Sequence, residues 1–208
     1  MRKLLPLLIL PLVFGCHGRF KKNASTLGAA RAEVITVRGP SVATPSSGGT
    51  GIVAAAFDIT QAVRAGNIAA HISSKVDPEQ VNDAFVRGFA DQLGDGPPFA
   101  YDANARPVLQ FELVDWGLEM YSFMSPGVYN YDLLVRGFDA NGKKIYKARF
   151  RCVTNAAESG WVEMSPFVGA DNPNKIKNLP PEAIQGIFDA TAEDCGRQVV
   201  SRMRYHAG

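Results

Sequence analysis

The chain has 208 residues, 46% of them hydrophobic, with 22 basic and 20 acidic residues and a formal net charge of +2. This length suits a single domain with a short extension, and the apolar content is sufficient for a core. The near-neutral charge excludes the general electrostatic attraction to nucleic acid, so we expect no nucleic-acid partner.

The N-terminus is organised like a bacterial lipoprotein signal. Two basic residues precede an apolar stretch at 4–14, which is shorter than the roughly 20 residues that span a bilayer. The stretch ends in Val13-Phe14-Gly15-Cys16, which resembles the lipobox of bacterial lipoproteins, although Phe14 stands where that motif has a small residue. We expect a signal peptide over residues 1–15 and lipid attachment at Cys16. An ordinary secretory signal with a cysteine nearby is the alternative.

The residues after this cysteine predict the anchor and the compartment. His17, rather than aspartate, follows the cysteine, and by resemblance to enterobacterial sorting rules this favours the outer membrane over the inner one. Residues 16–32 are basic and polar with little periodicity, so we expect the lipidated cysteine and a flexible tether, followed by one domain over 33–208. The basic residues of the tether could touch anionic head groups, each contributing around 1 kcal/mol. A solvated linker is the commoner meaning of such a sequence.

Three helices are expected. Apolar residues of the alanine-rich segment 52–76 step by three and four, although Gly66-Asn67 could interrupt this helix and a strand over 52–59 remains an alternative. Asp77 precedes proline and a helical apolar stripe that runs to Leu93, which predicts a capped helix. A last helix is expected over 181–205.

Four segments have the pattern of β-strands. They are 33–38, 108–115 with a continuation to 123 past a bend at Gly117, 128–138, and 144–153. Asp139-Ala-Asn-Gly142 predicts a tight hairpin turn between the last two. The fold class is therefore α+β: an antiparallel meander of three to four strands, with two or three helices on one face. The irregular segment 154–178 has a length usually found in functional or mobile loops.

Two cysteines remain outside the lipobox, Cys152 and Cys195. An even pair in an oxidising periplasm is a candidate disulfide, and periodicity places both on the inward faces of their elements. Closing a loop of about 44 residues would remove on the order of 4 kcal/mol of unfolded-state entropy. Two buried free thiols are the alternative.

Four cations form the most suggestive polar pattern. Lys147, Arg149 and Arg151 alternate along one strand, and Arg136 lies on the strand before it. Such a face could bind an acidic partner, such as lipid head groups, cell-wall polymer or another envelope protein. The alternative is a solvated face, balanced by acidic residues on the neighbouring strands (Glu112 and Asp132).

No convincing catalytic or metal site emerges from the remaining residue types. The acids Asp115, Glu119 and Asp132 have no spacing that fixes a catalytic pair. The three histidines are far apart in the sequence (His17, His71 and His206), so we expect no metal and no cofactor. No serine has a readable partner histidine. Five aromatic residues could line a groove, although core packing explains most of them (Trp116, Tyr121, Phe123, Tyr129 and Tyr131).

Three segments resemble small uncharacterised lipoproteins of myxobacterial type. They are the lipobox-like Cys16, the run Tyr146-Lys-Ala-Arg-Phe-Arg-Cys152, and the terminal Asp194-Cys-Gly-Arg-Gln-Val-Val-Ser-Arg-Met-Arg204. The likeness covers the signal and roughly the last hundred residues. It implies an envelope address and supports the disulfide, but it implies no activity.

We therefore expect a lipid-anchored, non-enzymatic envelope protein that binds another envelope component. A hydrolase acting on cell-wall or lipid substrates and a purely structural surface protein are the rival interpretations. A fold alone would not separate them.

Overall fold

In the computed structural model, the described residues are 15–24, 27–36, 38–43, 52–94, 96, 98–119, 128–154 and 176–207, without the side chains of 15–19, 52–57 and 59. The helices are α1 (Gly15–Ala24), α2 (Ile52–Ser73), α3 (Pro78–Leu93) and α6 (Pro181–Ala207). The strands are β1 (Ala29–Thr36), β2 (Ser41–Ala43), β3 (Ala100–Tyr101), β4 (Val108–Glu119), β5 (Val128–Phe138) and β6 (Lys144–Thr154). The α+β class is confirmed.

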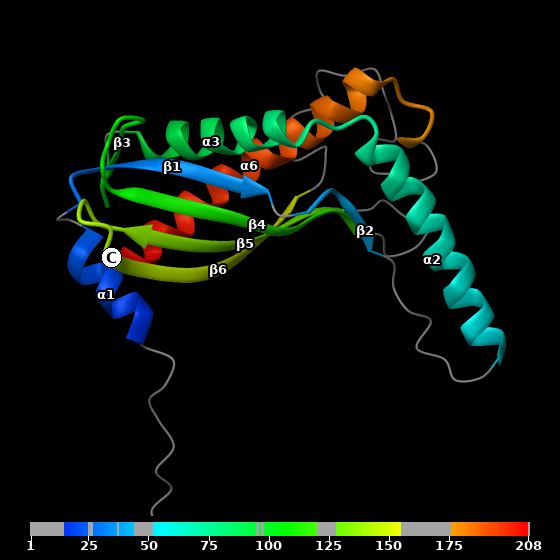
Figure 1. The fold of residues 1–208 in the computed structure, drawn as a ribbon, viewed down its shortest axis with the longest axis horizontal. Coiled ribbons are helices and arrows are strands. Elements are labelled where there is room, and N and C mark those ends of the chain that lie inside the picture. Colours follow the sequence, from blue (N-terminus) through cyan, green and yellow to red (C-terminus); the bar gives the residue numbers. More distant parts are fainter. Residues whose placement is uncertain are drawn as a thin grey trace, which may run out of the picture.

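One mixed sheet forms the first layer, and α3 and α6 cover one of its faces (Figure 1). The strand order is β3-β1-β4-β5-β6, and β2 also pairs with β4. Only β4, β5 and β6 form the expected antiparallel meander. β1 runs parallel to β3 and to β4, and β2 runs parallel to β4. The expectation of a purely antiparallel sheet of three to four strands was therefore wrong.

The parallel pairing of β1 and β4 has a clear physical basis. Parallel neighbours need a long crossover connection, because the chain must return to the same end of the sheet. The segment that contains α2 and α3 supplies that connection. The alternating pattern of a strand identifies its buried face, but it does not identify the neighbouring strand, so this pairing had no local signal.

Strand β4 shows the expected alternation together with a bulge. Leu109, Phe111 and Leu113 face the helices and are at most 1% exposed. The register with β5 then shifts between Leu113 and Asp115, which lets Trp116 return to the buried face. A Cβ atom on Gly117 would lie 2.0 Å from the carbonyl oxygen of Ser41, so glycine at this position permits the close approach of β2.

The β5–β6 hairpin matches its prediction. The inward residues of β5 have no exposed surface (Tyr129, Tyr131, Leu133 and Val135). At the turn, Asp139 Oδ1 accepts hydrogen bonds of 2.9 Å from the backbone N–H groups of Asn141 and Lys143. Gly142 adopts a φ of 76°, a conformation that glycine tolerates best.

Helix α3 begins and ends as its sequence predicts. The carboxylate of Asp77 accepts a 2.9 Å hydrogen bond from the backbone N–H of Glu79, and Gly94 ends the helix with a φ of 51°. Helices α3 and α6 cross at two glycines. A Cβ atom on Gly88 would lie 1.9 Å from the carbonyl oxygen of Glu193, and one on Gly196 would lie 2.3 Å from that of Phe85. The helix backbones are therefore nearly in contact.

Helix α2 is a continuous helix from Ile52 to Ser73, so neither the interruption at Gly66-Asn67 nor the alternative strand over 52–59 is present. It contacts β2 and extends beyond the sheet at the end opposite α1 (Figure 1). Within the described residues, no helix is both long enough and apolar enough to cross a bilayer.

Helix α1 replaces the first part of the expected flexible tether at 16–32. It packs against β6 and α6, and Phe20 is fully buried. The local reason is amphipathic spacing: Phe20 and Ala24 share one buried face, while Lys21 and Lys22 are exposed. The strand expected over 33–38 also begins earlier, at Ala29. Helix α1 thus includes the predicted lipidation site, Cys16.

Candidate functional site

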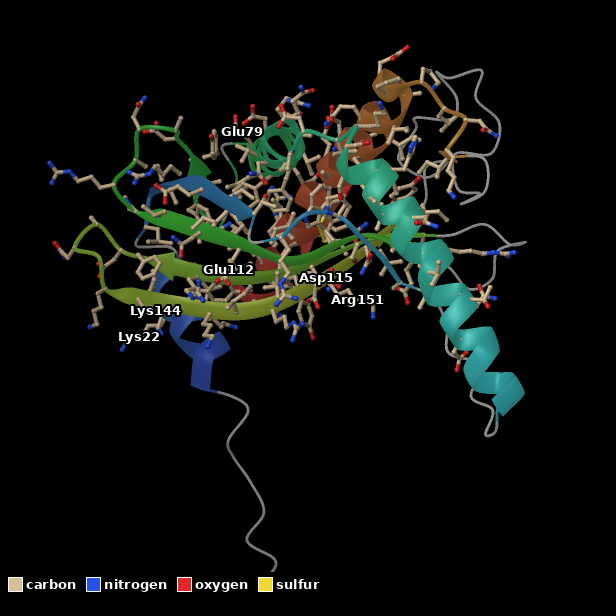
Figure 2. The ribbon with its side chains drawn as sticks, turned by 45° about the vertical axis from the view of Figure 1, so that its right-hand side comes forward. Lys22, Glu79, Glu112, Asp115, Lys144 and Arg151 are labelled. Carbon is tan, nitrogen blue, oxygen red and sulfur yellow. A yellow bond between two sulfur atoms is a disulfide. The ribbon has the colours of Figure 1, made fainter. Side chains whose placement is uncertain are left out.

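The sheet face opposite α3 and α6 contains all four cations that the sequence analysis singled out. On this outer face, Arg136 is half-buried, and Lys147, Arg149 and Arg151 are exposed. Figure 2 shows Arg151 here together with Glu112 and Asp115, whereas Glu79 lies on α3. The alternation of β5 and β6 places these side chains on one face, because every second residue of a strand points the same way.

Three of the four cations form ion pairs across the strands. Arg136 pairs with Glu112 at 2.5 Å. Arg149 donates two hydrogen bonds to the carboxylate of Asp132, at 3.0 and 2.5 Å. These bonds raise the pKa of Arg149 above its ordinary value. The predicted acids are therefore the partners of these cations.

The third pair joins Arg151 to Glu119, and Lys147 forms no ion pair or hydrogen bond among the described residues. Together with two charged residues of β1, and leaving aside Lys144 at the β5–β6 turn, the outer face has five basic and five acidic side chains. They are Arg31, Glu33, Glu112, Asp115, Glu119, Asp132, Arg136, Lys147, Arg149 and Arg151. The outer face is therefore charge-balanced rather than cationic.

Apolar side chains lie between these charges. Ile35 is 44% exposed and Val153 is 42% exposed, and Leu134 and Phe138 are half-buried. In the described part of the chain, no helix packs on this face. Protein interfaces combine apolar contact with a polar rim, and this face has both kinds of group.

The three candidate acids do not form a catalytic pair. Asp115 and Asp132 are register partners on β4 and β5. Each already has its own donor: the Ser41 hydroxyl bonds Asp115 at 2.8 Å, and Arg149 bonds Asp132. Their role in the described structure is to fix β2 and β6 against their neighbours.

The histidines lie on separate elements. His71 is on α2, and the Nδ1 atom of His206 on α6 lies 2.9 Å from the hydroxyl of Tyr146. The side chain of His17 is outside the described residues. Across the described ranges, no three His, Cys, Asp or Glu side chains are grouped as metal ligands. The absence of a metal and a cofactor stays a prediction.

The aromatic residues that the structure describes belong to the core. Trp116, Tyr129 and Tyr131 are fully buried and face α6. The hydroxyl of Tyr131 donates to the carbonyl oxygen of Phe188 at 3.0 Å. Burial raises the pKa of Tyr131 well above its ordinary value, so this group stays protonated. Tyr121 and Phe123 are outside the described residues, as is 155–175 of the expected loop.

The predicted disulfide between Cys152 and Cys195 is present. It joins β6 to α6 across the interior, with a Cα–Cα distance of 5.4 Å. Both residues have no exposed surface. The inference from strand and helix periodicity, which placed both thiols between the sheet and the helices, is confirmed.

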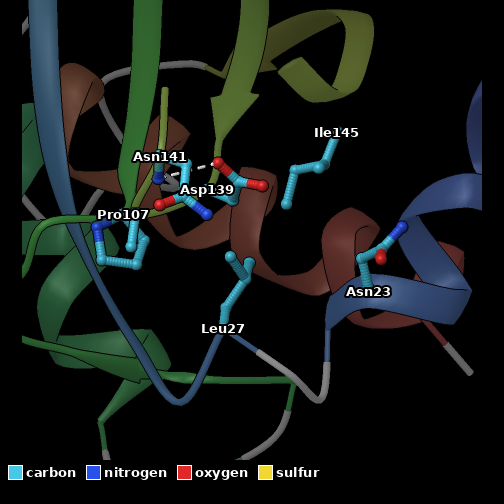
Figure 3. A pocket seen from close by; sticks show the side chains of 7 residues that line it. Asn23, Leu27, Pro107, Asp139, Asn141 and Ile145 are labelled. Atoms are coloured by element: carbon cyan, nitrogen blue, oxygen red, sulfur yellow. Dashed lines mark hydrogen bonds between the residues drawn. The ribbon is translucent and has the colours of Figure 1, made fainter. Parts of the chain in front are cut away.

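A hollow of about 280 Å³ lies where α1 meets the β5–β6 turn (Figure 3). Asn23 lines it from α1, and Asp139, Asn141 and Ile145 line it from the hairpin. The sequence did not predict this end of the molecule, because the segment around Phe20 has the composition of a tether. The four-residue spacing of Phe20 and Ala24 was the available signal.

Comparisons with known proteins provide no functional assignment. No protein-family model and no curated protein matches the chain. One similar solved structure is protein XCC0632 from Xanthomonas campestris, of family DUF330, at 12% identity and a TM-score of 0.42. The match covers 86% of this chain and 85% of that protein. Another is the hypothetical protein CT253 from Chlamydia trachomatis, at 10% identity and a TM-score of 0.37, covering 86% of this chain and 97% of that protein.

Proposed function

We propose that this chain is a lipid-anchored envelope protein that binds another envelope protein through the outer face of its sheet, without catalysing a reaction. The observation that carries the proposal is the asymmetry of the sheet. Helices α3 and α6 bury one face, while the other presents paired charges with exposed aliphatic groups between them, such as Ile35 and Val153.

The charge balance of the outer face favours a protein partner over an anionic cell-wall polymer. A polyanion needs a surplus of cations to replace its counterions, whereas here Arg136, Arg149 and Arg151 already have carboxylate partners. A protein surface can instead match alternating charges one by one, which gives specificity more than affinity.

Two features support the envelope as the compartment. The motif that ends at Cys16 resembles a lipobox, and Cys152 and Cys195 form a disulfide. Disulfides persist in oxidising compartments such as the periplasm and are rare in the reducing cytosol. Because His17, and not aspartate, follows Cys16, the enterobacterial sorting rule favours the outer membrane over the inner one.

The rival hydrolase has no support from the described residues. It would need a nucleophile beside a histidine, or two carboxylates converging on a scissile bond. The facing acids Asp115 and Asp132 are each engaged with a neighbouring side chain. The rival of a purely structural surface protein differs from our proposal in one testable respect, which is the presence of a dominant partner.

Photocrosslinking in intact cells of the native host would test the proposal. A benzophenone amino acid replaces Leu134 on the outer face, and a matched control replaces Glu79 on the exposed side of α3 (Figure 2). Because both positions are on ordered elements, the two variants should be equally abundant and equally membrane-bound.

We expect position 134 to give one dominant adduct with another envelope protein, and position 79 to give none. That adduct should decrease when Asp132 and Arg149 are both replaced by alanine, because the substitution removes a charge pair from the outer face. The same adducts from both positions, or no adduct from 134, would contradict binding through this face.

A further inference from the structure

Helix α1 fixes the domain rigidly to the residue that we propose is lipidated. Cys16 lies in the first turn of α1, which spans Gly15–Ala24. Further along this helix, the buried ring of Phe20 lies with its centroid 4.2 Å from that of Tyr146 and 6.4 Å from that of Phe99. A lipid on Cys16 would therefore be attached to a packed helix and not to a flexible tether.

Tyr146, which contacts Phe20 of α1, also contacts the last turn of α6. The hydroxyl of Tyr146 lies 2.9 Å from Nδ1 of His206, and the ring of His206 stacks on Phe150 at 5.7 Å between centroids. We use the term anchor end for three packed segments: α1, the β5–β6 turn (139–144) and the end of α6 (202–207). In Figure 1, α1 and the C-terminus of the chain lie together at this end.

The anchor end is basic. Lys22, Lys143 and Lys144 are all exposed, and Figure 2 shows Lys22 and Lys144 at the same end of the domain. Asn23 follows Lys22 and Ile145 follows Lys144 in the sequence, and both of these neighbours line the same hollow (Figure 3). Lys22 and Lys144 are therefore on adjoining segments.

Few acidic groups offset these lysines. Asp139 is the acidic residue of the turn, and its carboxylate accepts two backbone hydrogen bonds. α1 contains no acidic residue, and the end of α6 adds the exposed Arg202, whereas Arg204 donates to the carbonyl oxygens of Gln92 and Leu93 on α3. The anchor end therefore has the surplus of cations that the outer face lacks.

An exposed aromatic residue completes this end. Tyr205, on the last turn of α6, is 86% exposed, the largest exposure among the exposed large hydrophobic residues of the described chain. Tyrosine is enriched at membrane–water interfaces, because its ring prefers the head-group region while its hydroxyl stays hydrated. It is the immediate neighbour of His206, so it belongs to the same packed end.

We propose that the anchor end rests directly on anionic lipid head groups, which Lys22, Lys143 and Lys144 contact while Tyr205 enters the interface. This inference rests on the proposed acylation of Cys16. A helix rises 1.5 Å per residue, so Lys22 lies about 9 Å along α1 from Cys16. That distance is close to the Debye length of roughly 8 Å at physiological ionic strength, so the electrostatic attraction between Lys22 and the anionic membrane surface is only partly screened.

The consequence is a fixed orientation of the domain. β6 is an edge strand of the sheet, and α1 packs on it with its first turn pointing away from the sheet (Figure 1). Docking through the anchor end places the β6 edge nearest the membrane and leaves the outer face pointing sideways, accessible to a protein in the same membrane.

Lysine acetylation of the full lipidated protein tests this orientation. The protein, purified from membranes, is reconstituted in vesicles of phosphatidylcholine alone or with added phosphatidylglycerol. A membrane-impermeant acetylating reagent is applied, and each lysine is quantified by mass spectrometry. Lys75, exposed in the turn between α2 and α3 at the far end of the domain, is the internal control.

We expect Lys22 and Lys144 to react about fivefold more slowly on vesicles that contain phosphatidylglycerol, the factor that corresponds to the usual attraction of one cation to such a surface. Lys75 should react equally on both. The double variant Lys22→Gln/Lys144→Gln should abolish the protection of Lys143, whereas the matched variant Lys75→Gln/Lys177→Gln should retain it.

Two failures can be distinguished in one digest. If the Cys16 peptide is not acylated, the proposed function fails and the docking with it. If the peptide is acylated but Lys22 and Lys144 react equally on both vesicles, docking on anionic lipid is overturned and the proposed function stands.

Discussion

Removal of the disulfide is the perturbation whose size is best defined by the structure. Cys152 and Cys195 are separated by 43 residues in the sequence and join β6 to α6. In the chain-entropy account, closing a loop of this length removes about 4 kcal/mol of conformational entropy from the unfolded state. The double variant Cys152→Ala/Cys195→Ala should therefore be about 4 kcal/mol less stable than the oxidised protein.

Equilibrium urea unfolding, followed by circular dichroism, measures this loss. The variant should unfold at a lower urea concentration, with a slope that is equal or steeper, because its unfolded chain is less compact. Its melting temperature should decrease by roughly 8–16 °C, from about 2–4 °C per kcal/mol for a domain of this size. The wild type under a phosphine reductant is the matched control, since it loses the bond but retains both sulfur atoms.

The result that would refute this reasoning is a difference of less than about 1 kcal/mol between the oxidised protein and both altered forms. That outcome would mean that the unfolded chain is already restricted without the bond, or that the two thiols are free in the native protein.

Two further predictions concern α3 and α6. Gly88→Ala should lower the free energy of unfolding by about 3 kcal/mol, because its Cβ would overlap the carbonyl oxygen of Glu193. The control Gly66→Ala on α2 meets no atom within 4 Å and should raise the free energy of unfolding by about 1 kcal/mol. Thermal unfolding of both variants measures the difference, and equal losses of stability would contradict the close crossing of α3 and α6. Burial is the largest cause of the raised pKa of the Asp189 carboxyl. The folded state therefore binds the carboxyl proton more tightly than the unfolded state does. The free energy of unfolding decreases as the pH rises from the ordinary pKa of aspartate through the raised one. Asp189→Asn should therefore stabilise the protein at pH 7 more than at pH 3, and an equal effect at both pH values would show that the carboxyl does not titrate as its burial requires.

The sequence predicted the features that depend on local periodicity. Alternation identified the buried residues of β5 and β6, the Asp-Ala-Asn-Gly turn between them, and the capped start of α3 at Asp77. The disulfide followed for the same reason, because period alone placed Cys152 and Cys195 on faces that meet.

Features that depend on distant partners were missed. Nothing local to Val34 specifies that it lies beside Phe111 in a parallel pair, since a strand pattern does not name its neighbour. The cations of the outer face were correctly placed, but the pairing of Arg151 with Glu119 required the register of three strands. Helix α1 was missed because a short basic segment has the composition of a linker. Only the packing of Phe20 against β6 and α6 distinguishes it as a helix.

Intact-mass and N-terminal peptide analysis of the protein extracted from its native membrane tests the central claim most directly. We expect the mature chain to begin at Cys16 with a diacylglycerol on the thiol. We also expect the Cys16→Ser variant to be absent from the membrane fraction. An unmodified chain that retains residues 1–15, or a Cys16→Ser variant that remains fully membrane-bound, would contradict this claim.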